Sequence, residues 1–405
     1  MKKFLIFLFL ACAVIICGCS RNDYDPARPP DVIEGQEKDS PLELEIPEPY
    51  PPDVTLTFAG CGDNIMYNGT IRDAKSVAVE GGRKYNFAPI YENIKPIIES
   101  ADIAFINQET PMAGEEVGYD DYPRFNSPRD LAYDIVEAGF DIVNLATNHM
   151  LDAGSQGLAD TIEFWNTMPV TTIGGYLNED DFNNIRIIEK EDIKIALLSF
   201  TYSTNGLKLR SGYDIVIPYE DEDVIREQVL KANEVADLVF VSMHWGTEYS
   251  FKPNDNQKKL AEMMAGLGVD VVIGHHPHVL QPVEWVESPN GDGHRMLCVY
   301  SLGNLAAEQN NDYNMVGGII TFDIVRTNGE ITIENPLLIP TVYYFNRSFY
   351  KNSVHLMENF TEEMAKSHGL SYYGKYTTVE KLRSYVTKTV SAEFLPDFLK
   401  LYLIG

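Results

Sequence analysis

Histidines are concentrated at three places in this 405-residue sequence, each time beside residues that could bind a metal ion. The densest place has three imidazoles within four residues, which are costly to bury without a partner, so metal binding is favoured there over simple core packing. The other two combine histidine with a nearby amide or carboxylate. The three segments are Gly274-His275-His276-Pro277-His278, Asn148-His149 with Asp152, and His244-Trp245-Gly246 with Glu248.

Two further segments add carboxylates, namely Asp63 in a glycine-rich stretch and Asn107-Gln108-Glu109. Each residue alone has an ordinary structural explanation. An aspartate in a glycine-rich loop often only caps a turn. His149 could be a hydrogen-bonded core histidine, and Glu248 a solvated loop charge. The five segments together are more informative, because each one follows a predicted strand.

The combined set contains carboxylates, amides and imidazoles but no thiolate. Such a set suits divalent Mn, Zn or Fe, with one or two ions per chain. A centre with two ions can activate water and hold both oxygens of an in-line displacement at phosphorus. His294, His355 and His368 fall in hairpin or tail segments and are given no role.

The elements that must position these residues alternate between strands and helices. Strands are expected at 54–59, 102–107, 141–146, 193–200, 237–243 and 269–273, with 60–64 as a loop after the first. Helices are expected at 87–100, from Ser127-Pro128 to Ala138, and at 155–165, 220–234 and 254–267. Alternation of this kind predicts a layered α/β core, whose ligands bind at the carboxyl ends of the strands.

Beyond Gln281 the pattern changes to hairpins, with turns at 289–293 and 327–329. Residues 343–405 read as a helical extension rich in Tyr and Phe. The expected domain therefore covers 54–342, followed by the extension at 343–405.

The first residues predict export. Lys2 and Lys3 precede an apolar run that ends in Ile16-Cys17-Gly18-Cys19, which resembles a bacterial lipobox. Residues 1–19 are thus expected to be a lipoprotein signal peptide with Cys19 as the lipidation site, which would anchor the protein outside the cytoplasm. An ordinary secretory signal is the alternative. Residues 20–53 are rich in proline and acids and read as a disordered linker.

The charge is strongly acidic, with 32 Lys+Arg against 60 Asp+Glu and a formal net charge of −28. This excludes sequence-independent nucleic-acid binding, which needs a positive field. It also opposes a polyanionic substrate unless a metal ion or local cations such as Arg124 and Arg83 offset it. Outside the leader the cysteines are Cys61 and Cys298, and the sequence leaves open whether they form a disulfide.

These motifs carry a family resemblance. They occur in the order Gly62-Asp63, Asn107-x-Glu109-x-Pro111, Asn144 to Gly154 (NLATNHMLDAG), His244-Trp-Gly-x-Glu248-Tyr249, Gly274 to Gln281 (GHHPHVLQ) and Tyr300-Ser-Leu-Gly-Asn304. Together they resemble the CapA/PgsA family of bacterial poly-γ-glutamate capsule biosynthesis proteins, within the calcineurin-like metallophosphoesterase superfamily. The resemblance runs from about Val54 to about Asn304. It implies a layered β-sandwich flanked by helices.

Carried over residue by residue, the resemblance also implies roles at the site. His149 and Asp152 are implied as catalytic residues, and Asn107, His275 and Glu248 as residues that support the metal or bind substrate. Arg124 does not belong to a quoted motif; it precedes a predicted helix start and could face the site and bind substrate, or be a solvated surface arginine. His275 could equally be a ligand. The implied metal ligands are Asp63, Glu109, Asn148, His244, His276 and His278.

The sequence departs from the usual phosphoesterase motifs at two places. Ile65 stands where Asp-x-His has its histidine, and Asn107 and Glu109 stand where Gly-Asp-x-x-Asp is expected.

The resemblance as a whole implies a metal-dependent hydrolase of phosphoester or related acyl bonds, or an amide hydrolase that trims the polymer. The alternative is a non-catalytic accessory subunit. Expected partners are the cell membrane, polyglutamate or another envelope polymer, and membrane synthase subunits.

Overall fold

The computed structural model of the protein describes residues 51–77 and 82–400. The predicted signal peptide, its lipidation site Cys19 and nearly all of the predicted linker lie outside these residues. Within the described part, no helix combines the length and the hydropathy needed to cross a membrane.

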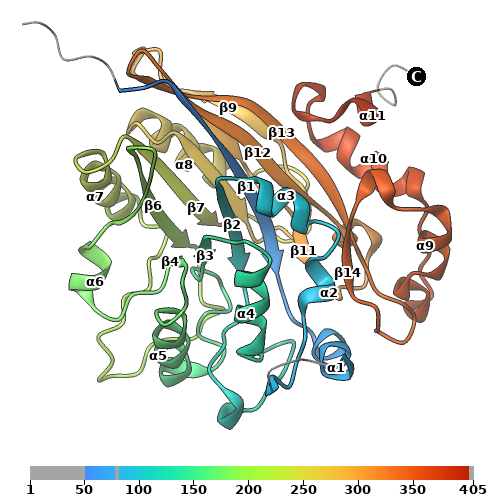
Figure 1. Ribbon diagram of the computed structural model, residues 1–405. Helices are drawn as coiled ribbons and strands as arrows, with labels where there is room; N and C mark the ends of the chain where they lie inside the picture. The colour runs from blue at the N-terminus through green and yellow to red at the C-terminus, as the bar shows by residue number, and fades with distance from the viewer. Residues whose placement is uncertain (1–50, 78–81, 401–405) are drawn as a thin grey trace, which may run out of the picture. The chain divides into compact units, whose positions relative to one another are not determined.

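The first sheet has eight strands in the order β14-β13-β12-β1-β2-β3-β4, with β11 pairing to β1. Figure 1 shows β1 between β12 and β2. β1 to β4 run parallel to one another, whereas β12 is antiparallel to β1, β13 to β12, and β14 to β13. The strands are β1 (Val54–Asn64), β2 (Ile103–Gln108), β3 (Ile142–Asn144), β4 (Thr171–Ile173), β11 (Asn304–Ala306), β12 (Val316–Thr327), β13 (Glu330–Tyr344) and β14 (Ser353–Leu356).

The second sheet has six strands in the order β5-β6-β7-β8-β10-β9. The four central strands are parallel, and the two edge strands are antiparallel to their neighbours. The strands are β5 (Arg186–Lys190), β6 (Ile193–Thr201), β7 (Leu238–His244), β8 (Val271–His275), β9 (Val283–Glu287) and β10 (Arg295–Val299).

The two sheets share one hydrophobic core. Phe58 of β1 stacks on Phe322 of β12 with ring centroids 4.6 Å apart, and both rings meet Phe240 of β7 edge-on. Alternate residues of β7 point the other way, because successive side chains of a strand face opposite sides. Val239, Val241 and Met243 accordingly pack in a separate cluster with helices α7 (Glu222–Asn233) and α8 (Asp255–Gly266).

Helices cover the outer faces of the sheets, and Figure 1 shows α7 and α8 beside β6 and β7. α8 begins with a capping box, in which Asn254 and Gln257 satisfy each other's backbone N–H groups. The helices are α1 (Asn68–Ser76), α2 (Ala88–Tyr91), α3 (Lys95–Ser100), α4 (Asp130–Glu137), α5 (Gly154–Trp165), α6 (Glu179–Asn183), α7 (Glu222–Asn233), α8 (Asp255–Gly266), α9 (Glu362–Ser367), α10 (Val379–Thr389) and α11 (Asp397–Lys400).

The predicted α/β layers flanked by helices are confirmed, with differences in detail. The expected loop at 60–64 is the continuation of β1. The expected helix at 87–100 is two short helices, because a proline at the start of α3 cannot continue the preceding turn. Residues 343–405 contain the end of β13 and all of β14 as well as helices. Cys61 and Cys298 are both buried and free, in different core clusters.

Candidate metal centre

The predicted ligand residues lie where the carboxyl ends of parallel strands from both sheets meet. In the first sheet Asp63 of β1 pairs in register with Asn107 of β2. In the second sheet His244 of β7 pairs with His275 of β8. Side chains at the end of the first sheet therefore lie close to side chains at the end of the second sheet.

Asp63 is fully buried and joins the two sheets. Its Oδ1 accepts a hydrogen bond of 2.9 Å from Nδ2 of Asn107 and lies 3.3 Å from Nδ1 of His275. Its Oδ2 lies 3.0 Å from Nδ1 of His278 and accepts the backbone N–H of His276 at 3.3 Å. The carboxylate is thus held in one orientation by groups from β2 and from the segment after β8.

Glu109 is the most exceptional group at the site. It is 1% exposed, and neither carboxylate oxygen has a hydrogen-bond partner in the described structure. Its Oε1 lies 3.7 Å from Nε2 of His278 and 3.9 Å from Nε2 of His244. A buried carboxylate is expensive to leave unpaired, so this geometry leaves room for a cation between the three residues.

Several ring nitrogens nearby are also buried without a hydrogen-bond partner among the described residues. They are Nδ1 of His244, both nitrogens of His275, and Nδ1 of His276. The other nitrogen of His244 lies 3.0 Å from Oδ1 of Asn148, which brings the amide into the same group. Unpaired imidazole nitrogens beside buried carboxyl oxygens are the kind of donors that suit a divalent ion.

The backbone after β8 takes a strained path that aims these imidazoles. His276 and His278 have positive φ angles of 95° and 54°, a region that non-glycine residues rarely adopt. Gly274 is required just before them, because a Cβ atom there would lie 2.0 Å from the carbonyl oxygen of Tyr300. Neighbouring segments over-determine this path, and Asn314 donates to the carbonyl of His278 at 3.0 Å.

The donor set therefore fits a divalent metal. Two triads bring one ligand atom from each residue within 4.8 Å of one another, namely Asp63, Glu109 and His278, and also Glu248, His276 and His278. All members are buried except Glu248. Since His278 belongs to both triads, the arrangement is compatible with two neighbouring ions or with one.

The pKa values of the site residues in the absence of metal are shifted in directions that agree with metal binding. Burial and the negative charge of Asp63 raise the pKa of Glu109 well above its usual range. Burial opposes a charge on His278, but Glu109 and Asp63 outweigh it and raise its pKa to about 9. Burial lowers the pKa of His276 to about 3. Burial would also raise the pKa of Asp63, but His275 and His278 hold it below its usual range. Metal binding would thus displace a proton from the pair formed by Glu109 and His278.

His149 and Asp152 form a second unit beside these residues. Nδ1 of His149 donates to Oδ2 of Asp152 at 2.7 Å, and the same oxygen accepts the backbone N–H of Phe125 at 2.9 Å. The ring of Phe125 meets the imidazole edge-on at 4.8 Å. The ring of His149 is thereby fixed, with Nε2 left for other contacts. It lines a cleft of about 280 Å³ with Asn148, Arg124 and Glu248, which we name the His149 cleft.

The two arginines that were expected near the site lie in different places. Arg124 is exposed but does line the His149 cleft. Arg83 does not lie there, since it pairs with Asp134 at 2.8 Å and with Glu137. Ile65, at the position of the missing histidine, is buried against Phe125 and Ala307.

Sequence reasoning gave no role to several residues that support the site. Oδ1 of Asn304 lies 3.0 Å from Nδ1 of His278, and Asn205 accepts from Asn148 at 3.3 Å. The ring of Tyr202 lies 4.5 Å from that of His276. Asn144 donates to Asn107 at 2.7 Å and so orients the amide that holds Asp63. Asn304 and Asn144 had a signal, because they stand in the quoted motifs Tyr300-Ser-Leu-Gly-Asn304 and Asn144 to Gly154, whereas Asn205 and Tyr202 had none.

Known proteins resemble this chain in sequence. It is 29% identical to the capsule biosynthesis protein CapA of Bacillus anthracis over 69% of this chain and 66% of that protein. It is 32% identical to the PGA biosynthesis protein CapA of Bacillus subtilis over 54% of this chain and 57% of that protein. The match therefore spans less than two thirds of either relative.

Among solved structures, the calcineurin-like phosphoesterase YfkN from Bacillus subtilis aligns with a TM-score of 0.42 and 13% identity, over 83% of this chain and 97% of that one. A sequence profile of one protein family, described as bacterial capsule synthesis protein PGA_cap, matches residues 56–309, which is more than half of the chain. The matched range contains every predicted ligand and both residues of the His149–Asp152 pair. The chain belongs to the bacterial capsule synthesis protein PGA_cap family.

Proposed function

We propose that this chain is a metal-dependent hydrolase that acts outside the cytoplasm on a phosphoester or a related acyl bond during assembly of an envelope polymer such as poly-γ-glutamate. The observation that carries the proposal is Glu109, whose two buried carboxyl oxygens lack hydrogen-bond partners among the described residues while imidazoles of His244 and His278 lie 3.9 and 3.7 Å away. A site that only stabilised the fold would not leave a buried carboxyl group without a partner.

The six predicted ligands would hold the metal, and His275 would orient Asp63. A divalent ion bound there would supply Lewis-acid activation of an attacking water and of a substrate oxygen. The ligands lie at the ends of strands or just after them, so the site needs no large rearrangement to bind a metal ion. The predicted ligands are Asp63, Glu109, Asn148, His244, His276 and His278.

His149 is proposed to give a proton to the leaving group. Its Nδ1 is bound to Asp152, so Nε2 is the nitrogen that can serve the His149 cleft. Asp152 would stabilise the imidazolium form and fix the ring, as a buried carboxylate does in other acid–base pairs. Arg124 supplies a positive charge at the cleft for an anionic group. These roles are confined to groups that line one cavity.

A second candidate function is a non-catalytic accessory subunit that binds nascent polyglutamate or its membrane synthase. Ile65 favours this candidate, because a buried aliphatic side chain stands where a histidine ligand of the phosphoesterase motif is expected. Anchoring through Cys19 is part of both candidates.

The test is the metal content of the purified full chain, measured by mass spectrometry, together with hydrolysis of bis-p-nitrophenyl phosphate. We expect about one to two ions per chain, lost in His276→Ala/His278→Ala but kept in His355→Ala, a control on β14. Hydrolysis should disappear with a chelator and in His149→Ala, while His149→Ala keeps its metal. Absence of metal even after reconstitution with Mn²⁺ or Zn²⁺ would leave the accessory role.

A further inference from the structure

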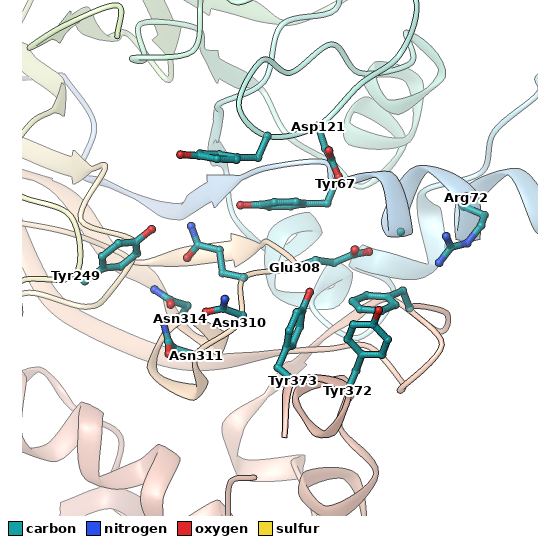
Figure 2. A pocket seen from close by; sticks show the side chains of 14 residues that line it. Tyr67, Arg72, Asp121, Tyr249, Glu308, Asn310, Asn311, Asn314, Tyr372 and Tyr373 are labelled. Atoms are coloured by element: carbon teal, nitrogen blue, oxygen red, sulfur yellow. The ribbon is translucent and has the colours of Figure 1, made fainter. Parts of the chain in front are cut away.

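A larger cavity of about 460 Å³ lies beside the His149 cleft, and five of its lining residues are tyrosines. We name it the tyrosine cavity, after Tyr67, Tyr122, Tyr249, Tyr372 and Tyr373. Figure 2 shows Tyr67 on one side, Tyr372 and Tyr373 on the opposite side, and Tyr249 at one end.

The two cavities share a wall. Tyr122 lines both of them, and Glu248 of the His149 cleft is adjacent in sequence to Tyr249 of the tyrosine cavity. The ring of Tyr249 lies 6.2 Å from that of His278, and Asn314, also in the lining, bonds to the carbonyl of His278. A ligand in the tyrosine cavity would therefore extend toward the candidate metal centre.

The aromatic rings offer flat apolar faces at the mouth of the cavity. Tyr122, Tyr249 and Tyr372 are 73%, 43% and 60% exposed, so a large part of each ring is accessible to a ligand. Tyr372 and Tyr373 pack edge-on against each other and against Phe349, so their orientations are fixed. Rigid tyrosines bind ligands at a low entropic cost and supply a hydroxyl as well as a face.

Side-chain amides supply short-range hydrogen bonds between these rings. Lys375 donates to the amide oxygens of Asn310 and Asn311 at 3.3 and 2.6 Å, and their N–H groups have no bond to another described residue, so they can donate to a ligand. Asn314 is fully buried, and its Oδ1 has no hydrogen-bond partner in the described structure. A buried amide oxygen of this kind requires a donor, which a ligand in the cavity can provide.

The charges of the lining disfavour an anion. Asp121 is acidic, Glu308 is kept protonated by burial, which raises its pKa to about 8, and Arg72 is the single cation among the lining residues. Arg72 already donates to the carbonyl of Ser348 and stacks over Tyr350, and it lies at the end away from Tyr249 in Figure 2. A free carboxylate would be repelled by Asp121 and would find no unengaged cation among the lining residues, whereas hydroxyl groups can donate to Asp121, accept from the amides and exchange hydrogen bonds with the carboxyl group of Glu308.

We infer that the tyrosine cavity binds an uncharged sugar ring, whose apolar faces stack on the tyrosines and whose hydroxyls pair with the amides and carboxyl groups. This inference rests on the proposed function in one respect, because it makes the sugar part of the molecule whose reactive group reaches the metal centre. The substrate class is then a glycosylated ester, in place of bare polyglutamate.

The test is calorimetric titration of the full chain, with EDTA present so that the result does not depend on metal. The probes are a panel of neutral sugars (glucose, galactose, N-acetylglucosamine and their short oligomers). A γ-linked glutamate tetramer represents an anionic ligand, and tetramethylammonium a cation that could bind to the aromatic rings. We expect a sugar to bind and Tyr372→Ala/Tyr373→Ala to weaken it about tenfold, the effect of losing roughly 1.4 kcal/mol of contact. Tyr376→Ala is the matched control, since Tyr376 is 70% exposed nearby and does not line the cavity.

Four results would overturn the inference: no sugar of the panel binds, the double variant binds sugar as the parent does, the glutamate tetramer binds at these tyrosines, or tetramethylammonium does. Circular dichroism of the double variant ensures that lost binding is not lost folding. Loss of metal or of hydrolysis, with sugar binding retained, would instead refute the proposed function alone.

Discussion

Asp63 and His278 are 215 residues apart in the sequence, yet Oδ2 of one lies 3.0 Å from Nδ1 of the other. Asp63 is the penultimate residue of β1, the central strand of the first sheet, and His278 follows the end of β8 in the second sheet. The candidate centre therefore straddles both sheets. A ligand that binds only this folded arrangement must stabilise the fold by mass action.

The first prediction concerns Glu109→Gln. Without metal this substitution removes a buried, unpartnered carboxyl group beside Asp63, so we expect the melting temperature in EDTA to be equal to or higher than that of the parent. Added Mn²⁺ or Zn²⁺ should raise the melting temperature of the parent by several degrees and that of the variant much less. Thermal unfolding with and without metal measures both effects.

Glu189→Gln, on the exposed edge strand β5, is the control and should respond to metal as the parent does. Equal stabilisation of parent and Glu109→Gln by metal would show that Glu109 is not a ligand.

The second prediction concerns Asp152→Asn. In the parent a single oxygen of Asp152 accepts from both His149 and the backbone of Phe125. The amide oxygen of Asp152→Asn can accept both bonds, so the fold should survive while the imidazolium loses its counter-charge. Relative to the parent, we expect kcat toward bis-p-nitrophenyl phosphate to fall about 10²-fold, and in His149→Ala by about 10² to 10⁴-fold.

Because Asp152 acts through His149, its substitution should also move the pH profile of kcat while KM and metal content change little. A changed metal content in Asp152→Asn would place this carboxylate among the ligands, and an unchanged kcat would remove His149 from the chemistry.

Much of the fold could be predicted from local pattern, because strands and helices of usual length leave a period of two or of 3.6 residues. The three-residue strands β3, β4 and β11 are too short for this signal, and only β3 was expected. The predicted end of β1 was wrong because Gly60 and Gly62 read as a loop. In the structure Gly62 is needed, since a Cβ atom there would lie 2.1 Å from the carbonyl oxygen of Gly303.

The residues of the candidate site were also predicted only in part. Residue types at strand ends identified Asp63, Glu109 and His278, which do lie together, while their role as ligands stays a prediction. Asn205 and Tyr202 were not identified, because they lie on a loop whose approach to Asn148 and His276 depends on long-range packing. No local pattern encodes such an approach.

The third prediction concerns the core between the sheets. Phe240 of β7 meets Phe58 and Phe322 of the first sheet, so Phe240→Ala would open a cavity that rigid strands cannot close. We expect the free energy of unfolding to fall by about 3 to 5 kcal/mol in urea titrations, and Phe240→Leu to cost much less. A loss below about 1 kcal/mol for Phe240→Ala would mean that the sheets repack easily.

The fourth prediction concerns Glu308, which is 7% exposed and accepts a hydrogen bond of 2.7 Å from Thr70. Burial raises its pKa from 4.5 to about 8. Between these values the folded chain keeps a proton that the unfolded chain has released. Glu308 therefore makes the free energy of unfolding fall as pH rises through this window, by up to about 1.4 kcal/mol per pH unit.

Glu308→Gln keeps an acceptor for Thr70 but has no proton to release, so its stability should lose this dependence. Urea unfolding at about pH 5 and about pH 8 should show the variant gaining on the parent toward the higher pH, by up to a few kcal/mol. Every other titrating group is common to both proteins and cancels in the difference, whereas Glu189→Gln should show no such gain. If Glu308→Gln and the parent instead keep the same stability difference at both pH values, Glu308 is ionised in the folded chain throughout this range.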